Sequence, residues 1–414
     1  MENLPEKKGQ LFLFTVSFPY GTGENFISNE LLFLSSKFEK IFIFPLESKG
    51  DPKPVPANCE VIDLFTAWSF SGASTFFRHP VLCVRLMVAE FFSVKKKSSF
   101  FRLRNELRSH LLQCISRSEL LETRLRSMDT SKAVLYTFWF NDWATMLALL
   151  KRKKTIRKYI TRVHGYDLYH FRRKEGIVPF RNFQLKHVSG IFAVSQHGGN
   201  YLKQEFPRYA DKVHVAHLGV FDKGINPMPE NREYVMVSCA NVIPVKRVLD
   251  IYRALMHTQT NLHWIHFGHG PLMDELKQAI GKLPATIKVT LKGNIPNAEL
   301  IGFYKTSPVS FFVHTSESEG GVPVAIQEAV SFGIPVIAVG AGGVPEIVNE
   351  NTGTLIPEET YSPVVLANEI DRFLESERNT RAFREKVKAY WCTFFDAEQN
   401  FGKFHQAIIK NTNN

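Results

Sequence analysis

Short apolar runs alternate with helical patterns along most of the 414 residues of this chain. In the first half the runs are residues 11–16, 41–44, 134–137, 159–163 and 191–195. Each run is rich in β-branched and aromatic residues and has the length of one buried strand. Strands that are joined through helices form parallel sheets, and the helices cover the faces of those sheets. The alternation therefore predicts an α/β fold and excludes a disordered or fibrous chain.

A polar, proline-containing passage at residues 222–232 interrupts the alternation, and a second series of apolar runs follows it. These later runs are residues 234–238, 262–267, 287–291, 310–313 and 335–339. Hydrophobic side chains make up 44% of the chain, which is enough for two separate cores. We therefore predict an N-terminal domain at residues 1–224 and a C-terminal domain at residues 225–390. The aromatic segment at residues 391–414 is predicted to be a helix that packs back on the N-terminal domain.

Cysteine usage and the apolar segments indicate a cellular compartment. The five cysteines are scattered, odd in number and without metal-ligand spacing, so we interpret them as reduced thiols of a cytosolic protein. Residues 1–8 lack the basic and then apolar pattern of a signal peptide. The most apolar segment, residues 81–94, is short and contains Arg85 and Glu90, so no membrane-spanning helix is expected.

Positive charge is concentrated in one part of this chain, whose formal net charge is +11. Between residues 151 and 174 there are ten Lys or Arg side chains and one acid, Asp167. The segment is either a solvated basic surface or an attractor of an anionic partner. For such a partner, anionic lipid or a phosphate-bearing acceptor fits better than nucleic acid, because no nucleic-acid-binding motif accompanies the charge. The helical interval at residues 76–125 leaves a similar choice between packing on the sheet, which we favour, and resting on a membrane surface.

Residues 316–346 combine two glycine pairs, acids and prolines around two apolar runs. The pattern indicates a strand, a loop and a helix that starts at Pro323, so the loop lies at the carboxyl end of a strand, where α/β sheets bind ligands. Gly320 and Gly321 would let the backbone approach a ligand, and the amides of the following helix could bind phosphate. Glu328 could accept hydrogen bonds from the hydroxyls of a ribose. A capped turn with surface acids is the alternative interpretation.

Three pieces of this stretch, residues 316–323, 327–338 and 342–348, together resemble the C-terminal signature of the retaining family 4 glycosyltransferases, which have the GT-B fold. Four further segments resemble loops of the same family, namely residues 18–26, 162–169, 237–248 and 267–271. The similarity covers most of the chain and is strongest from residue 237 to residue 348. It implies two Rossmann-like domains that face each other across a cleft. An acceptor would bind the N-terminal domain and a nucleoside diphosphate-sugar the C-terminal domain.

The resemblance also implies roles for individual residues. Lys246 would neutralise the diphosphate of the donor, Glu319 would contact hydroxyls of the donor sugar, and His164 would hydrogen-bond that sugar from the N-terminal domain. The other implied donor-binding positions are Asn241, Arg247, Gly268, Gly320, Gly321, Val322, Pro323 and Glu328, and the acceptor-side positions are Gly21, Gly23 and Asp167. Taken without the resemblance, His164 is equally a structural histidine. No cofactor and no metal ion is implied.

Two positions depart from the family pattern. Glu319 and Glu328 are separated by eight residues, where the family commonly has seven. Asn241 stands five positions before Lys246, where many members have an arginine that contacts the diphosphate. Lys246, with help from Arg247, would then carry more of that neutralisation.

These expectations describe a metal-independent enzyme that transfers a sugar, with retention, from a nucleoside diphosphate-sugar to a glycan or lipid-linked acceptor in cell-surface polysaccharide synthesis. The expected place is the cytoplasm, with peripheral contact to the inner face of the plasma membrane. Three alternatives remain open at this point. They are a sugar-nucleotide epimerase or hydrolase on the same fold, a non-catalytic scaffold that binds sugar nucleotide, and a peripheral membrane adaptor.

Overall fold

The structure is a computed structural model that describes residues 9–21, 24, 26–130, 132–228 and 234–413. It divides into two compact units, which are called the first and the second domain below. The first domain is Met1–Ala216 with Phe401–Asn414, and the second is His217–Asn400. The predicted boundary at residue 224 therefore lies inside the second domain. The terminal segment predicted from residue 391 also divides differently, because it joins the first domain only from Phe401 onward.

The passage predicted to separate the domains is anchored to the second domain by hydrogen bonds. The buried side chain of Asn226 donates to the backbone oxygen of Tyr304 at 2.6 Å and accepts from the backbone nitrogen of Val309 at 2.9 Å. Lys388 Nζ lies 2.5 Å from a carboxylate oxygen of Asp222. Polar residues here satisfy backbone groups of the domain, and composition alone does not distinguish that role from a solvated linker.

The first domain contains a seven-stranded sheet with the order β3-β2-β1-β4-β5-β6-β7, in which every pairing is parallel. The strands are β1 (Gln10–Thr15), β2 (Lys40–Pro45), β3 (Cys59–Val61), β4 (Ala133–Thr137), β5 (Ile160–Val163), β6 (Gly190–Ala193) and β7 (Val213–Val215). The apolar runs of the first half form β1, β2, β4, β5 and β6. The short edge strands β3 and β7 were not predicted, because three residues give no periodic pattern.

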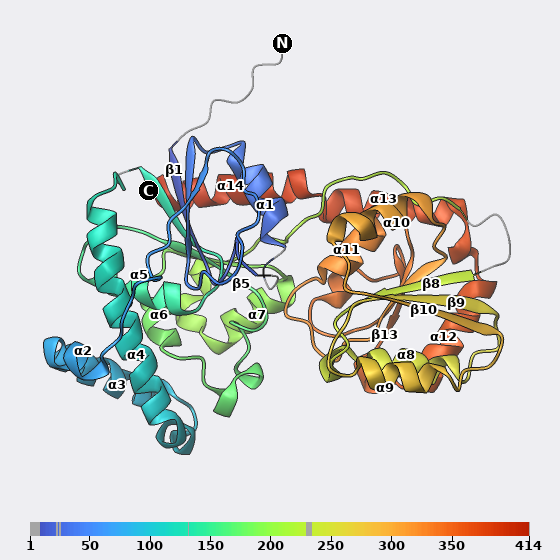
Figure 1. Cartoon of the computed structure of the whole chain (residues 1–414), viewed down its shortest axis with the longest axis horizontal. Coiled ribbons are helices and arrows are strands. Elements are labelled where there is room, and N and C mark those ends of the chain that lie inside the picture. The colour runs from blue at the N-terminus through green and yellow to red at the C-terminus, as the bar shows by residue number, and fades with distance from the viewer. Residues whose placement is uncertain (1–8, 22–23, 25, 131, 229–233, 414) are drawn as a thin grey trace, which may run out of the picture. The chain divides into compact units, whose positions relative to one another are not determined.

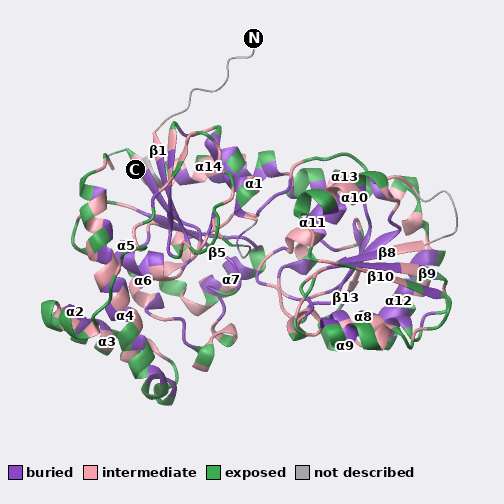
Figure 2. Ribbon diagram, in the orientation of Figure 1, coloured by how far each residue is buried: buried purple, intermediate pink, exposed green. Residues whose placement is uncertain are grey.

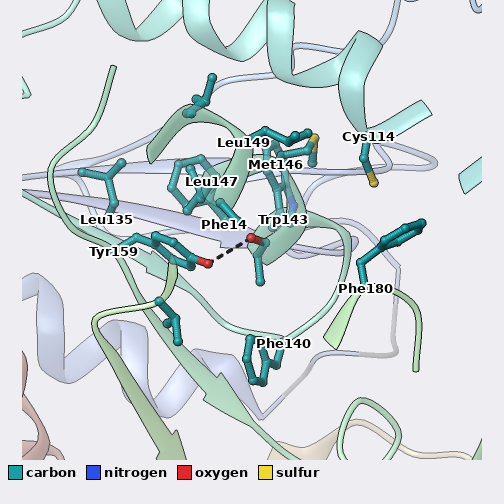
Figure 3. Packing of buried hydrophobic residues seen from close by; sticks show 14 of the residues in the cluster. Phe14, Cys114, Leu135, Phe140, Trp143, Met146, Leu147, Leu149, Tyr159 and Phe180 are labelled. Carbon is teal, nitrogen blue, oxygen red and sulfur yellow. Dashed lines mark hydrogen bonds between the residues drawn. The ribbon is translucent and has the colours of Figure 1, made fainter. Parts of the chain in front are cut away.

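Helices cover both faces of this sheet (Figure 1). The helices of this part of the chain are α1 (Ile27–Ser35), α2 (Gly72–Arg78), α3 (Pro80–Ser93), α4 (Lys97–Arg126), α5 (Asp142–Arg152), α6 (Arg181–His187) and α7 (Gln196–Glu205). Of these, α2 and α3 pack against α4 and lie away from the sheet (Figure 1). Phe14 of β1 and Trp143 of α5 lie in one buried cluster, with ring centroids 4.8 Å apart. Figure 3 shows this cluster, in which the Tyr159 hydroxyl donates a hydrogen bond of 3.1 Å to the backbone oxygen of Ala144. The buried hydroxyl is thus satisfied within an apolar core.

The interval at residues 76–125 falls within α2, α3 and α4. Helix α4 packs through Leu107 and Leu111, which are almost completely buried. Helix α3 buries Cys83 and Leu86 but has exposed residues on its opposite side, and exposed positions are coloured green on the ribbon of Figure 2. Packing on the domain thus accounts for one face of these helices and leaves the outer face of α3 in solvent.

The second domain contains a six-stranded parallel sheet with the order β10-β9-β8-β11-β12-β13. The strands are β8 (Tyr234–Cys239), β9 (Leu262–Phe267), β10 (Ile287–Gly293), β11 (Phe311–His314), β12 (Val336–Val339) and β13 (Gly353–Ile356). Along β11, Phe312 and Val313 point into different buried clusters, as the two-residue period of a strand requires. The predicted runs of the second half form all of these strands except the edge strand β13.

Helices α8 (Val248–Leu255), α9 (Met273–Ile280) and α12 (Pro363–Glu375) cover one face of this sheet, and α10 (Asn297–Thr306), α11 (Val324–Ser331) and α13 (Arg381–Phe394) cover the other (Figure 1). Each face has its own core. Val313 of β11 packs with Ile251 of α8, whereas Phe312 packs with Ile326 of α11. The sheet is therefore buried on both sides, which explains why its strands read as continuous apolar runs.

The terminal helix α14 (Ala397–Asn413) carries aromatic side chains into the core of the first domain. The ring of Phe404 lies 5.4 Å from that of Tyr136, and the guanidinium of Arg162 lies 4.0 Å above it. Arg162 in turn forms a fully buried ion pair with Glu30 at 2.9 Å. The aromatic tail is thus held by packing. Among the described residues no helix is both long and apolar enough to cross a membrane.

Candidate functional site

The residues predicted to bind the donor meet where β8 and β11 lie side by side at the centre of the second sheet. The order of the strands reverses between β8 and β11, and ligands of open α/β sheets bind outside the carboxyl ends of the strands at such a point. The two loops that follow these strands are bonded to each other. Thr315 Oγ1 donates to the backbone oxygen of Lys246 at 3.0 Å, and the Glu317 amide donates to Val245 at 2.9 Å.

The side chains of Lys246 and Glu319 form an ion pair at this point. Lys246 Nζ lies 2.5 Å from Glu319 Oε1, and the same oxygen lies 2.9 Å from His314 Nε2. Lys246 is the last residue of the short 3₁₀ turn η4 (Pro244–Lys246), which follows β8, and His314 is the last residue of β11. The Lys246 side chain exposes 25% of its surface, whereas the His314 side chain exposes 4%. A cation is thus held at the mouth of the site.

The pKa of Glu319 is held well below its usual range. Burial alone would raise it, but the hydrogen bond and the charge of His314, followed by the charge of Lys246, outweigh the effect of burial. Glu319 is therefore ionised at every physiological pH. His314 was not predicted from the sequence, although its place at the end of a central strand was a usable signal.

Glu328 has the opposite electrostatic character. It projects from α11 and is almost completely buried, and its Oε1 accepts a hydrogen bond of 2.7 Å from the side chain of Asn297, the first residue of α10. Burial raises the pKa of Glu328 to about 7, and the Asn297 hydrogen bond opposes part of that rise. A carboxyl group poised near neutrality, with capacity for further donors, suits the recognition of hydroxyl groups. Asn297 was also missed by sequence reasoning.

Glycines let the loops of the site approach one another. Gly342 has a φ of +57°, and a Cβ there would lie 1.9 Å from the backbone oxygen of Glu319. The next glycine, Gly343, is pressed against Gly321 in the same way, with a Cβ position 2.6 Å from the Gly321 carbonyl carbon. Gly268, with a φ of +139°, lies equally close to Ala240. Only glycine fits these positions, so the glycine pairs of the sequence are required by packing as well as by any ligand.

The start of α11 offers free backbone donors. Pro323 is its N-cap residue and has no side-chain cap, and the first helical bond comes from the Gln327 amide to the Pro323 oxygen at 3.1 Å. The amides between them are available to an anion. Val322 is buried in the hydrophobic core, so it could contact a ligand only through its backbone. Gly320 and Gly321 lie in the loop just before this helix start.

Asn241 and Arg247 flank the lysine differently. Asn241 is exposed in the loop after β8. Arg247 has a left-handed backbone with a φ of +48°, and its guanidinium lies 3.7 Å from the carboxylates of both Glu317 and Glu358. Arg247 thus lies near two acids at 3.7 Å, whereas Lys246 has one closer carboxylate partner, Glu319 at 2.5 Å.

The predicted residues of the first domain surround the carboxyl ends of β1, β4 and β5. His164 follows β5 and is buried between rings, with the Trp139 ring 4.5 Å and the Phe138 ring 4.7 Å from its own. Within the described part of the chain, neither ring nitrogen of His164 has a hydrogen-bond partner. Burial, and then the charge of Arg162, hold the pKa of His164 well below its usual range. Its imidazole is therefore neutral and has unused capacity to hydrogen-bond.

Asp167 shapes the loop that carries this histidine. Its carboxylate accepts hydrogen bonds from the backbone nitrogens of His164 at 2.9 Å and of Phe140 at 2.7 Å. The same residue lines a cavity of about 400 Å³, together with Glu24, Trp139, Tyr166 and Arg173. Asp167 is almost completely buried, so its observed role is to position the backbone at the edge of the cavity.

Glu24 was not predicted, yet it organises the loop after β1. Its carboxylate accepts from the backbone nitrogens of Ser17 at 2.5 Å and Phe18 at 2.6 Å and from Trp139 Nε1 at 2.5 Å. Trp139 follows β4, the neighbour of β1, so Glu24 bridges the central strands as Lys246 and Glu319 do in the second domain. Gly21 has a φ of +64° in this loop, and Gly23 lies outside the described residues.

One cluster of potential metal ligands arises from the tertiary structure. Ligand atoms of His110, Cys114 and Asp142 lie within 4.8 Å of one another, and the set contains no ion. The Asp142 carboxylate already lies 3.9 Å from the guanidinium of Arg117. The three ligands come from two helices, α4 and α5, so cysteine spacing in the sequence does not indicate this cluster.

The architecture of two parallel-sheet Rossmann-like domains is that of the GT-B glycosyltransferases. The crystal structure of Anabaena HepE in complex with UDP-glucose has this fold, and it superposes on 96% of this chain and 99% of its own with a TM-score of 0.66 and 16% identity. Residues 223–390 match the family described as glycosyl transferases group 1. The second domain is therefore a group 1 glycosyltransferase domain in a chain with the GT-B fold.

Curated relatives match parts of the chain. The sulfoquinovosyl transferase of Arabidopsis thaliana is 33% identical over 153 residues, which is 34% of this chain and 29% of that protein. The putative colanic acid biosynthesis glycosyltransferase WcaL of Escherichia coli is 25% identical over 244 residues, which is 55% of this chain and 58% of that protein. The matched region thus spans less than two thirds of either relative.

Proposed function

We propose that this protein is a retaining glycosyltransferase that transfers a sugar from a nucleoside diphosphate-sugar to a glycan or lipid-linked acceptor in the synthesis of a cell-surface polysaccharide. One observation carries the proposal. Lys246, the free amides at the start of α11, and Glu328 converge at the carboxyl end of the central strands of the second domain. The UDP-glucose bound to HepE and the polysaccharide named for the relative WcaL support the donor and acceptor classes.

The proposed roles follow from charge. Glu328 holds the ribose of the donor, and Lys246 with the α11 amides binds the diphosphate. As the bond to the sugar breaks, negative charge grows on the departing phosphate, so donors placed in advance lower the barrier. The proposal assigns this neutralisation to protein groups and requires no metal ion. Full transfer activity after treatment with a chelator is the expected result, and activity that returns only with added Mg²⁺ or Mn²⁺ would contradict it.

We infer that the acceptor binds in the first domain at the cavity of about 400 Å³. Trp139 and Tyr166 offer ring faces to a sugar, and Arg173, whose guanidinium lies 4.2 Å from the Tyr166 ring, offers a cation to a phosphate group. His164 lies against Trp139 beside this cavity, and its ring nitrogens have no hydrogen-bond partner among the residues that the structure describes. Its proposed hydrogen bond to the reacting sugar rests on the family resemblance. Contact with an anionic membrane at the cytoplasmic face is a separate proposal.

The test is a thermal-shift screen of the purified chain against UDP, GDP, ADP and CMP and their common sugar conjugates. A ligand that binds only the native state raises the melting temperature, so one nucleotide should give a clear shift. The shift should disappear in Glu328→Ala and persist in Glu317→Ala, which alters an exposed acid of the loop that precedes α11. No shift with any nucleotide, or an equal loss in both variants, would reject the donor site.

The donor identified in that screen then separates the rival activities. Incubation with the radiolabelled sugar nucleotide and a membrane extract should move the label into glycan or lipid. Release of free sugar without acceptor would indicate a hydrolase, and conversion to an isomeric sugar nucleotide an epimerase. Binding with no chemical change under any of these conditions would leave a non-catalytic scaffold.

A further inference from the structure

The outer face of α3 carries an apolar stripe in solvent. Val81, Val84, Val88 and Phe92 expose 79%, 55%, 49% and 73% of their surface. Their spacing of three and four residues places them on one side of the helix, opposite the buried Cys83. The apolar stripe therefore exists in addition to the face that packs on the domain. Apolar side chains gathered in this way mark a contact surface more often than scattered exposed residues do.

Neighbouring helices carry further exposed aromatic side chains. Phe77 near the end of α2 exposes 79% of its surface, and Phe101 near the start of α4 exposes 54%. Both belong to the helices that flank α3 in the chain, and the ribbon of Figure 2 has green, exposed positions along α2 and α3. Large aromatic side chains are costly to leave in water, so an environment that accepts them stabilises the bound state.

A basic cavity lies at one side of α3. It has a volume of about 450 Å³ and is bounded by α3, α6 and the 3₁₀ segment η3 (Pro207–Lys212). Four exposed cations line it, namely Arg85, Arg152, Lys186 and Arg208. Within the described ranges, none of these four side chains forms an ion pair with a carboxylate. The cavity is thus a concentration of positive charge without internal compensation.

The other titratable groups at this cavity do not cancel the charge. The Glu90 carboxylate accepts a hydrogen bond of 2.9 Å from the Phe180 amide, and burial raises its pKa to about 7. The pKa of His187 is lowered to about 4 by burial and then by the charges of Lys186, Lys151, Arg152 and Lys212. Burial is the larger cause of this lowering, and the positive charge of the surrounding side chains adds to it.

We propose that this surface docks on a membrane, with the phosphate of an anionic phospholipid in the basic cavity and the apolar stripe of α3 in the acyl region of the same leaflet. The two features adjoin, because Arg85 lies on α3 between Val84 and Val88 and lines the cavity. Guanidinium and ammonium groups bind phosphate oxygens, and an apolar face beside cations is the composition of helices that lie in an anionic interface. A nucleic acid would satisfy the cations but would leave the apolar stripe in water.

The experiment is flotation of the full chain with two kinds of vesicle. One is phosphatidylcholine alone, and the other also contains phosphatidylglycerol, so that about one headgroup in three is anionic. Wild type should float with the anionic vesicles only. A cavity variant (R85A, R152A, K186A, R208A) and a stripe variant (V84S, V88S, F92S) should each lose at least about tenfold in partitioning. A charge-matched control changes four exposed lysines of the second domain (K282A, K288A, K292A, K305A) and should float as wild type does.

Each other outcome rejects the proposal. Failure of wild type to float does so directly, and equal loss in the charge-matched control would show that only net charge matters. Retained flotation of the stripe variant would show that the apolar stripe contributes nothing. A rise in melting temperature with glycerol phosphate or inorganic phosphate, together with no flotation, would assign the basic cavity to a free phosphate. Because the variants could fold poorly, each is first compared with wild type by circular dichroism, and a variant that melts early is replaced by the single changes R85A and V88S.

Discussion

Lys246 Nζ lies 2.5 Å from Glu319 Oε1, so the cation expected to bind the donor diphosphate is already paired with the carboxylate expected to bind the donor sugar. Two groups assigned to different parts of one ligand thus neutralise each other before that ligand arrives. Binding of a diphosphate must share or replace this ion pair. His314 and then Lys246 lower the pKa of Glu319, so this carboxylate stays ionised at the end of a parallel sheet.

Replacing Glu319 with glutamine should therefore separate nucleotide affinity from turnover. The change frees Lys246, so the affinity for the nucleoside diphosphate product should rise by about threefold to tenfold, the range expected for one released charge interaction. Sugar transfer should fall by at least about tenfold, because a contact to the donor sugar is lost. Calorimetric titration with the nucleotide and initial rates measure the two effects. Weaker nucleotide binding would show that Glu319 positions the ammonium instead of competing for it.

Replacing Lys246 with alanine should abolish useful transfer while the fold remains. Loss of one preplaced donor to a growing charge typically lowers kcat by about 100-fold to 1,000-fold. The buried Glu319 keeps its 2.9 Å contact with His314, so the melting temperature should fall by only a few degrees. Lys282→Ala, a change at an exposed lysine of the same domain, is the matched control. Rates within about twofold of wild type would remove Lys246 from the mechanism.

Donor binding should depend on pH through Glu328. The pKa of this buried carboxyl is raised to about 7 in the folded protein, and the ionised form accepts hydrogen bonds from a ribose. Affinity for the nucleotide should thus increase by about tenfold from pH 6 to pH 8. Asn297→Ala removes a hydrogen bond that lowers this pKa, so it should move the transition to higher pH. An affinity that does not change with pH in this range would argue against a ribose contact by the carboxylate.

The same group should make stability depend on pH in a defined direction. A carboxyl with a raised folded pKa binds its proton more tightly in the native state, so the stability it contributes is complete below pH 4.5 and is lost as pH rises to about 7. Glu328→Gln has no such loss. The free energy of unfolding of Glu328→Gln minus that of wild type should therefore increase by about 2 to 3 kcal/mol from pH 5 to pH 8. Denaturant unfolding at both pH values measures this difference, and a constant difference would contradict the burial effect.

Gly342→Ala should distort the loop that carries Glu319. A Cβ at this position would lie 1.9 Å from the Glu319 oxygen, and the φ of +57° adds strain, so a cost of about 3 kcal/mol or more is expected. Gly302→Ala is the control, because its Cβ would meet nothing within 4 Å and the residue lies inside α10. That control should be stabilising by about 0.5 to 1 kcal/mol. Equal effects of the two changes would show that the close approach at Gly342 is relieved at little cost.

Local patterns predicted the central strands because those strands are buried on both faces and read as unbroken apolar runs. The edge strands β3, β7 and β13 escaped prediction, since their three or four residues gain their pairing only from a neighbouring strand. The predicted domain boundary at residue 224 lies after the observed boundary at residue 216 for a related reason. Asn226 looks like a linker residue in the sequence, but its side chain binds backbone groups about 80 positions away.

The alternation of strands and helices, the glycines that tight loops require, and the residue types at the strand ends can all be read from the amino-acid order. Those properties are local, because each depends on near neighbours and on whether a side chain prefers water. The folded chain was needed to show that Lys246 pairs with Glu319, that Asn297 bonds to Glu328, and that one face of α3 stays in solvent. These contacts join residues far apart in the chain, and the order of strands in each sheet, which no local pattern encodes, brings them together.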